Sequence, residues 1–160
     1  MSRTTTRTVL VTGGTSGIGR AVAARFAADG AEVHLTGRQP DAVERAAREL
    51  GVRGAVCDAT DPVATAALAT RFDTLDVLVN AAGGLPASPA TGTPLGDLLA
   101  AWQAGLAQNL LGAVLTTEAV RGALAPGGSV ISLGSIGAER RGGAYGAAKA
   151  ALAAWSAAAR

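Results

Sequence analysis

The chain has 160 residues, enough for one domain with a hydrophobic core, and its 49% hydrophobic and 16% charged residues exclude an intrinsically disordered protein. Its formal net charge is only +2 and its arginines are scattered, so we expect no nucleic-acid partner. No uninterrupted apolar run approaches the roughly 18 residues that a membrane span needs, and the N-terminus lacks a signal-peptide pattern, so we expect a cytoplasmic protein without membrane contact.

Short apolar runs alternate with amphipathic, alanine-rich runs along the sequence. The apolar runs predict strands over residues 8–12, 32–36, 52–57, 76–80 and 129–133. The alanine-rich runs predict helices over residues 17–29, 41–50, 61–72, 95–124 and 143–160, with a loop rich in Gly, Pro and Ser at 81–94. A Pro-Gly-Gly sequence after residue 124 is interpreted as the stop of the long helix.

The strict alternation of strand and helix predicts an α/β fold, with a Rossmann-type, doubly wound parallel sheet. We expect residues 1–160 to form a single domain of this kind. The last expected element is a helix, whereas a crossover helix in an open sheet normally returns to another strand. We therefore expect either that the chain is truncated or that further strands come from elsewhere.

Cysteine and histidine occur once each. Cys57 lies at the end of an apolar run and cannot form an internal disulfide, so we interpret it as an inert core residue. His34 lies within an expected strand and is interpreted as structural. No cluster of His, Cys and carboxylate residues has the spacing of metal ligands, so we expect no metal.

A glycine-rich turn, TGGTSGIG, connects the first expected strand to the first helix. Its glycines follow the spacing G-x3-G-x-G, which lets the backbone approach a pyrophosphate at the positive end of a helix. The position of the turn, between a strand and a helix, predicts a dinucleotide site. The residues expected to form it are Gly13, Thr15, Ser16, Gly17, Ile18 and Gly19.

The only tyrosine and the only lysine of the chain lie four residues apart. At that spacing, Tyr145 and Lys149 share one face of a helix. Arginine fills every other basic position, so the single lysine indicates a need that the larger guanidinium does not meet. The pKa of an unperturbed tyrosine is about 10. A neighbouring cation favours the phenolate, which makes a phenol usable in acid–base chemistry. Alone, this pair is also compatible with an incidental surface contact.

Taken together, these motifs resemble the short-chain dehydrogenase/reductase family, over the whole chain. The two asparagines occupy family positions: Asn80 in NAAG, where typical members read N-N-A-G and Ala81 replaces the second Asn, and Asn109 in QNLLG. The segment SLGSIGA resembles the family's serine segment and aligns Ser135 with the catalytic serine; Ser132 is the alternative. The spacing from Ser135 to Tyr145 is a few residues shorter than is usual in the family.

The resemblance implies a set of catalytic roles. Tyr145 would exchange a proton with a substrate oxygen while hydride passes to or from the nicotinamide, and Ser135 would orient that oxygen. Lys149 would favour the phenolate and hold the ribose hydroxyls, and Asn109 would hold a water that links Lys149 to solvent. The catalytic set expected from the resemblance is Asn109, Ser135, Tyr145 and Lys149.

The end of the second expected strand indicates the choice of cofactor. An acidic residue there would select NAD, whereas this chain has Thr36, Gly37 and Arg38. A guanidinium suits a ribose 2′-phosphate, so we expect NADP, with NAD as the alternative. Asp58 resembles the family's adenine-contacting aspartate. Besides the glycine-rich turn, the expected cofactor residues are Arg38, Asp58, Ala59, Asn80, Ala81, Gly83, Tyr145 and Lys149.

The sequence therefore predicts an NAD(P)(H)-dependent oxidoreductase acting on a small carbonyl or alcohol substrate. The alternatives are a catalytically inactive nucleotide-binding module and a fragment of a larger ketoreductase. Because the long helix from Leu95 and the last helix are apolar over several faces, and family members pair these helices, we also expect a homodimer or homotetramer.

Overall fold

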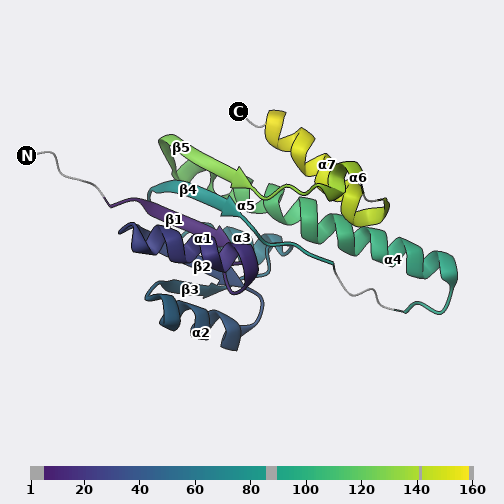
Figure 1. The fold of residues 1–160 in the computed structure, drawn as a ribbon, viewed down its shortest axis with the longest axis horizontal. Coiled ribbons are helices and arrows are strands. Elements are labelled where there is room, and N and C mark those ends of the chain that lie inside the picture. The colour runs from purple at the N-terminus through teal and green to yellow at the C-terminus, as the bar shows by residue number, and fades with distance from the viewer. Residues whose placement is uncertain (1–5, 86–89, 141, 159–160) are drawn as a thin grey trace, which may run out of the picture.

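A computed structural model describes residues 6–85, 90–140 and 142–158. These residues contain one five-stranded sheet in the order β3-β2-β1-β4-β5, and every neighbouring pair of strands is parallel (Figure 1). The strands are β1 (Thr8–Thr12), β2 (Glu32–Gly37), β3 (Arg53–Val56), β4 (Leu75–Asn80) and β5 (Leu124–Ser132). The predicted Rossmann-type parallel sheet is confirmed.

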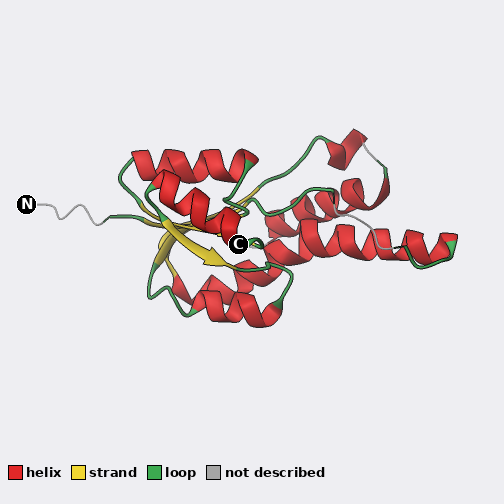
Figure 2. Ribbon diagram, turned by 90° about the horizontal axis from the view of Figure 1, so that it is seen from below, coloured by secondary structure: helices red, strands yellow, loops and turns green. Residues whose placement is uncertain are grey.

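Helices cover both faces of the sheet (Figure 2). They are α1 (Gly17–Ala28), α2 (Pro40–Leu50), α3 (Pro62–Ala69), α4 (Pro94–Leu106), the π-turn η1 (Ala107–Leu111), α5 (Gly112–Val120), the 3-10 turn η2 (Arg121–Ala123), α6 (Gly137–Arg140) and α7 (Gly143–Ala158). Helices α1 and α2 contribute to the core clusters on one face, and α3 and α5 to the cluster on the other. Helix α7 packs on α4 and η1, and α4 extends away from the sheet (Figure 1).

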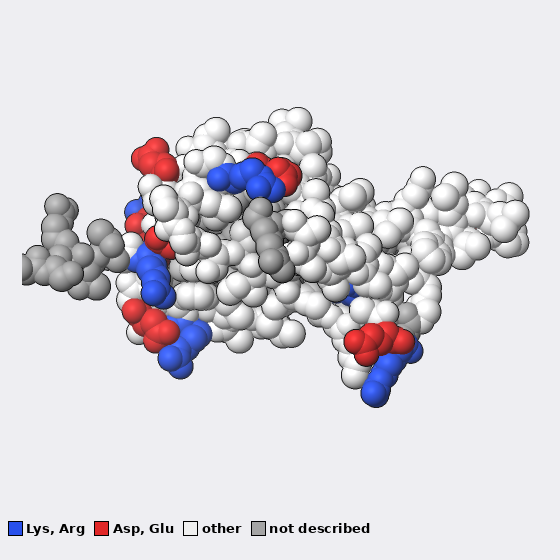
Figure 3. Space-filling view, turned by 90° about the horizontal axis from the view of Figure 1, so that it is seen from above, with Lys and Arg blue, Asp and Glu red and all other residues white. Residues whose placement is uncertain are grey.

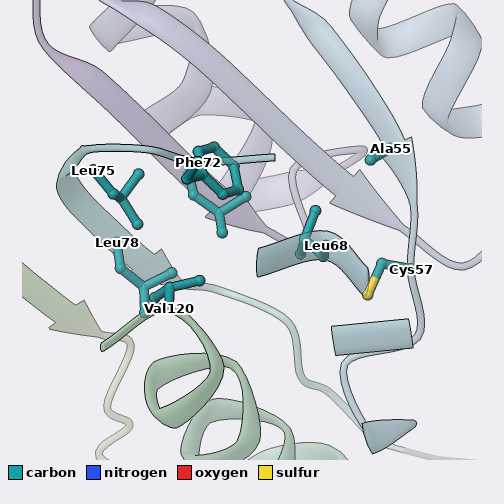
Figure 4. Close-up of a cluster of buried hydrophobic side chains, with 8 residues drawn as sticks. Ala55, Cys57, Leu68, Phe72, Leu75, Leu78 and Val120 are labelled. Carbon is teal, nitrogen blue, oxygen red and sulfur yellow. The ribbon is translucent and has the colours of Figure 1, made fainter. Parts of the chain in front are cut away.

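Side chains of the central strands alternate between the two faces, as expected for strands buried on both sides. Val9 and Val11 of β1 face α1, whereas Leu10 belongs to the opposite cluster shown in Figure 4. That cluster joins Leu10, Ala55, Cys57, Leu68, Phe72, Leu75, Leu78 and Val120. His34 is buried and its ring lies edge-on to Phe72 at 4.8 Å between centroids, which agrees with a structural role.

The boundaries of β5 differ from the prediction. The helix does not run through residue 124: β5 begins at Leu124 and continues through the Pro-Gly-Gly sequence, which interrupts the register with β4 between Leu75 and Val77. Gly127 adopts a left-handed φ of 79°, so this sequence makes an irregularity within a strand and not a helix stop. Helix α6 and the π-turn η1 were not predicted, and α3 ends at Ala69, before the predicted residue 72.

Candidate active site

The glycine-rich turn brings the ends of β1 and β4 against the start of α1. A Cβ on Gly13 would lie 2.7 Å from the Cα of Ala82, and the backbone there has a left-handed φ of 66°. A Cβ on Gly19 would overlap the carbonyl of Gly13. The missing side chains therefore allow the turn to pack against the loop after β4, and they leave the N-terminus of α1 open to a ligand. A pyrophosphate fits such a cradle.

A cleft of about 370 Å³ opens in front of this turn. Every residue that the sequence predicted for the cofactor lines the cleft except Asn80: Gly13, Thr15, Ser16, Gly17, Ile18, Gly19, Arg38, Asp58, Ala59, Ala81, Gly83, Tyr145 and Lys149. The cleft also includes residues that were not predicted as contacts: Thr36, Gly37, Cys57, Thr60, Ala82, Gly84, Gln108, Leu133 and Gly134. The sequence signal for several of these was their position beside a predicted contact, as with Gly84 after Gly83 and Gln108 before Asn109.

Asn80 lies at the end of β4 but beneath the cleft. It is 4% exposed, and its Nδ2 donates to the hydroxyl of Thr117 on α5 at 3.0 Å. Its Oδ1 has no hydrogen-bond partner among the described residues. The Asn80 side chain therefore lies between β4 and α5 and is not part of the lining of the cleft.

Arg38 and Asp58 lie at the end of the cleft formed by β2 and β3. Gly37 allows close packing at this end, because a Cβ there would lie 2.6 Å from Cγ2 of Thr15. One oxygen of Asp58 accepts from the backbone N–H of Thr60 at 2.9 Å and from its hydroxyl at 2.8 Å. These contacts fix the carboxylate while leaving it room to accept another donor, such as an exocyclic amine.

Lys149 and Tyr145 lie in the same cleft, on α7. The Lys149 ammonium donates to the carbonyl of Leu133 at 2.8 Å, and its Nζ lies 5.9 Å from the centroid of the Tyr145 ring. Lys149 is only 7% exposed. Burial lowers the pKa of this ammonium, and charge on Tyr145 acts in the opposite direction. The structure therefore holds the Lys149 ammonium beside the Tyr145 phenol, at a position with little access to water.

Ser135 follows β5 and lies beside Tyr145. Its Oγ accepts from the backbone N–H of Gly137 at 3.0 Å. Ser132, the alternative serine, is still within β5, where it lies in register with Asn80. Ser135 Oγ and Cε1 of Tyr145 both lie 3.1 Å from the position of a Cβ on Gly137, so these two side chains are neighbours.

Asn109 is buried in the π-turn η1, and its side chain binds backbone atoms. Its Oδ1 accepts from the N–H of Gly84 at 2.9 Å, and its Nδ2 donates to the carbonyls of Gly84 at 2.8 Å and Gly105 at 3.1 Å. Gly83 lies between Asn109 and Lys149, since a Cβ there would be 2.9 Å from the Asn109 Oδ1 and 3.6 Å from the Lys149 Nζ. Asn109 therefore anchors the loop that lines the cleft, and both hydrogens of its amide are already used.

Cys57 lines the cleft but has the properties of an unreactive thiol. Burial raises its pKa, and the negative charges of Asp58 and Asp61 act in the same direction. Because the thiolate is the reactive form, these effects agree with the interpretation of Cys57 as an inert residue. Within the described ranges, no group of three or more His, Cys, Asp or Glu residues is arranged to hold a metal ion.

A parallel sheet whose glycine-rich turn opens onto a helix N-terminus is the arrangement of a dinucleotide-binding fold, and Tyr145 and Lys149 lie in the same cleft as this turn. The sequence profile of the short chain dehydrogenase family matches residues 7–160. The chain belongs to that family.

Two curated relatives illustrate the match. A protein of Mycobacterium tuberculosis that is assigned as an oxidoreductase is 39% identical over 151 residues, covering 92% of this chain and 66% of the relative. Serine 3-dehydrogenase of Rhizobium radiobacter is 38% identical over 156 residues, covering 91% of this chain and 61% of the relative. The chain thus spans somewhat less than two thirds of the length of these relatives.

Solved structures support the same assignment. A short chain dehydrogenase of Burkholderia cenocepacia in complex with NADP has a TM-score of 0.77 at 35% identity, covering 93% of this chain and 65% of that one. A short-chain type dehydrogenase/reductase of Mycobacterium ulcerans also has a TM-score of 0.77, at 34% identity, covering 91% of this chain and 58% of that one.

Proposed function

We propose that the intact protein is an oxidoreductase that transfers hydride between a nicotinamide dinucleotide and a small carbonyl or alcohol substrate. The observation that carries this proposal is the placement of Tyr145 and Lys149 in the cleft that the glycine-rich turn also lines. Ser135 lies next to this cleft, across Gly137 from Tyr145. A module that only bound the nucleotide would not need a phenol, a buried ammonium and a hydroxyl at this point. We further propose that residues 1–160 form its nucleotide-binding domain and that it works in the cytoplasm, without nucleic acid or membrane.

Each residue has a defined task in this proposal. When bound, the nicotinamide supplies or accepts the hydride. The Tyr145 phenol gives a proton to the substrate oxygen during reduction and takes it back during oxidation, and the Ser135 hydroxyl donates a hydrogen bond that orients this oxygen. The buried Lys149 favours negative charge on the phenol and offers its other N–H groups to ribose hydroxyls.

We propose NADP as the preferred cofactor. Arg38 lines the cleft at the end of β2, and Asp58, beyond the neighbouring β3, already binds Thr60. A guanidinium pairs with a 2′-phosphate through charge-assisted hydrogen bonds, whereas a carboxylate at the end of β2 would be required to favour two free ribose hydroxyls. The Burkholderia cenocepacia structure, which contains NADP, supports this choice by likeness.

Replacing Tyr145 with phenylalanine tests the proposed activity. Tyr145→Phe keeps the ring but removes the proton donor, so turnover of a panel of ketones by the intact protein is expected to fall by about 10²–10⁴-fold. The dissociation constant for NADPH, measured by fluorescence titration, is expected to change little, because the turn and Arg38 are untouched. A variant that kept more than roughly a tenth of the wild-type rate would contradict the role.

Lys149→Arg is the companion variant. It keeps the positive charge but replaces a compact ammonium with a larger, planar guanidinium at a buried position. It is expected to reduce turnover and, unlike Tyr145→Phe, to weaken NADPH binding as well.

If the wild-type protein binds NADPH tightly but reduces none of the ketones and oxidises none of the matching alcohols, the binding-module alternative is favoured instead.

A further inference from the structure

Gly137, the first residue of α6, lies between the two side chains that would contact the substrate oxygen. Its backbone N–H donates to the Ser135 Oγ at 3.0 Å. A Cβ on this residue would lie 3.1 Å from the Ser135 Oγ and 3.1 Å from Cε1 of Tyr145. Gly137 itself is buried. One backbone position therefore contacts both the hydroxyl and the phenol ring.

The backbone conformation does not explain why this residue is glycine. Gly137 is absent from the residues with a left-handed φ, so alanine could adopt the same backbone. The residue also begins a helical turn, where alanine is the better helix former. The close contacts with Ser135 and Tyr145 are the remaining constraint.

We propose that Gly137 is a positioning residue that sets the distance and orientation between the Ser135 hydroxyl and the Tyr145 ring. This inference rests on the proposed function. The N–H of Gly137 occupies one acceptor position of the Ser135 oxygen, which leaves the serine's own O–H to donate elsewhere, to the substrate oxygen. The missing side chain lets the edge of the Tyr145 ring approach the same oxygen. The residue acts through its two neighbours and does not itself touch the reacting atoms.

The test uses Gly137→Ala and Gly137→Val in the intact protein, with Gly142→Ala as the matched control. Gly142 lies in the same connection between Ser135 and Tyr145, has no left-handed φ, and a Cβ there would have no atom within 4 Å. The kcat and KM for a ketone, the dissociation constant for NADPH and the midpoint of thermal unfolding are measured for each variant.

We expect kcat to fall roughly fivefold for Gly137→Ala, because a displacement of a few tenths of an ångström is a fraction of the 1 Å that costs about 10²-fold. Gly137→Val is expected to lose more. NADPH affinity and the unfolding midpoint should stay near wild-type values, and Gly142→Ala should match the wild type throughout. A residue with only a packing role gives a different pattern, in which the added methyl group lowers the unfolding midpoint while kcat is kept.

A double-mutant cycle with Ser135→Ala provides a second measurement. If Gly137 acts through the serine hydroxyl, Gly137→Ala should cost less in the Ser135→Ala background than in the wild type, because the two residues share one interaction. Equal costs in both backgrounds, or a kcat for Gly137→Ala that matches Gly142→Ala, would overturn the inference. A wild-type protein with no turnover, or a Tyr145→Phe variant with full turnover, would instead overturn the proposed function and this inference with it.

Discussion

At the scale of single residues, scarcity in the sequence indicated two side chains that the structure brings into one cleft. Tyr145 and Lys149 are the only residues of their types, and the structure places both in the cleft in front of the glycine-rich turn. Lys149 is almost completely buried and donates to a backbone carbonyl, a position in which a guanidinium would leave several N–H groups without partners. The composition and the structure therefore both agree with a need for a compact ammonium at this position.

Arg38 carries a prediction about cofactor choice. Arg38→Asp replaces the proposed partner of the 2′-phosphate with a like charge, so NADPH binding should weaken by at least the roughly 1.5–3 kcal/mol of a charge-assisted hydrogen bond, or more than tenfold. NADH, which lacks the phosphate, should lose far less. Parallel titrations of the intact protein with both cofactors measure the difference, and Arg45→Asp on the exposed side of α2 is the control for net charge. Equal losses for the two cofactors would refute the assignment.

Other residue assignments required tertiary information. The partner of Asn109 is the backbone of Gly84, which lies 25 residues earlier in the chain, and no local pattern indicates this pairing. The sequence also gave no means to separate Asn80, which faces Thr117, from its neighbours that line the cleft. Ser135 could be chosen over Ser132 only by resemblance, whereas in the structure Ser132 is the last residue of β5 and Ser135 borders Gly137 together with Tyr145.

At the scale of elements, the strands and their order of appearance were predictable because each is a short apolar run between turn residues. The predicted boundaries of elements were wrong where a local sequence rule had two interpretations. Pro-Gly-Gly ends helices, but here it lies in an irregularity of β5 between Leu124 and Ser129, where the missing N–H of a proline costs no ladder hydrogen bond. The π-turn η1 was not predictable from residue preferences, because it depends on how Asn109 and α7 pack against the loop after β4.

Asn109 links the π-turn to the cleft, which gives an element-scale prediction. Asn109→Ala removes the partners of the Gly84 N–H and carbonyl, so the free energy of unfolding should fall by about 1–3 kcal/mol. NADPH affinity should fall as well, because Gly83 and Gly84 line the cleft. Denaturant unfolding and NADPH titration measure the two effects, and Gln103→Ala on the exposed side of α4 is the control. A variant with wild-type stability and affinity would show that this anchor is dispensable.

At the scale of the whole molecule, the distribution of charge and apolar surface is uneven. The helical run Pro94–Ala123 has Asp97, Glu118 and Arg121 as its only charged residues. The protruding part of the molecule, formed by α4, shows no charged side chain on the face seen in Figure 3. By length and composition alone, this run is long and apolar enough to cross a membrane, with a mean hydropathy of 1.3 over an 18-residue window. Part of the run serves the fold, since Thr116, Thr117 and Val120 are buried against the sheet.

The exposed part of α4 carries an apolar stripe. Leu95, Leu98, Leu99 and Trp102 follow the spacing i, i+3, i+4 and i+7, which places them on one side of the helix, and they are 79%, 54%, 58% and 37% exposed. An apolar stripe of this length on a protruding helix usually marks an interface. We propose a second copy of the chain as its occupant, because a stripe without charges is self-complementary around a twofold axis.

The intact protein is therefore expected to be a dimer or tetramer by light scattering at tens of micromolar. Leu98→Glu places a charge in the proposed interface on both subunits and removes a side chain whose burial contributes about 1.5–3 kcal/mol, so the subunit dissociation constant should rise at least roughly tenfold. Val63→Glu is the matched control, since Val63 is 76% exposed on α3, outside the stripe. A wild-type monomer, or a Leu98→Glu variant that associates as tightly as Val63→Glu, contradicts the interface. Sedimentation of the wild-type protein with phosphatidylcholine vesicles, lost in Leu98→Glu and kept in Val63→Glu, would assign the stripe to a lipid surface instead.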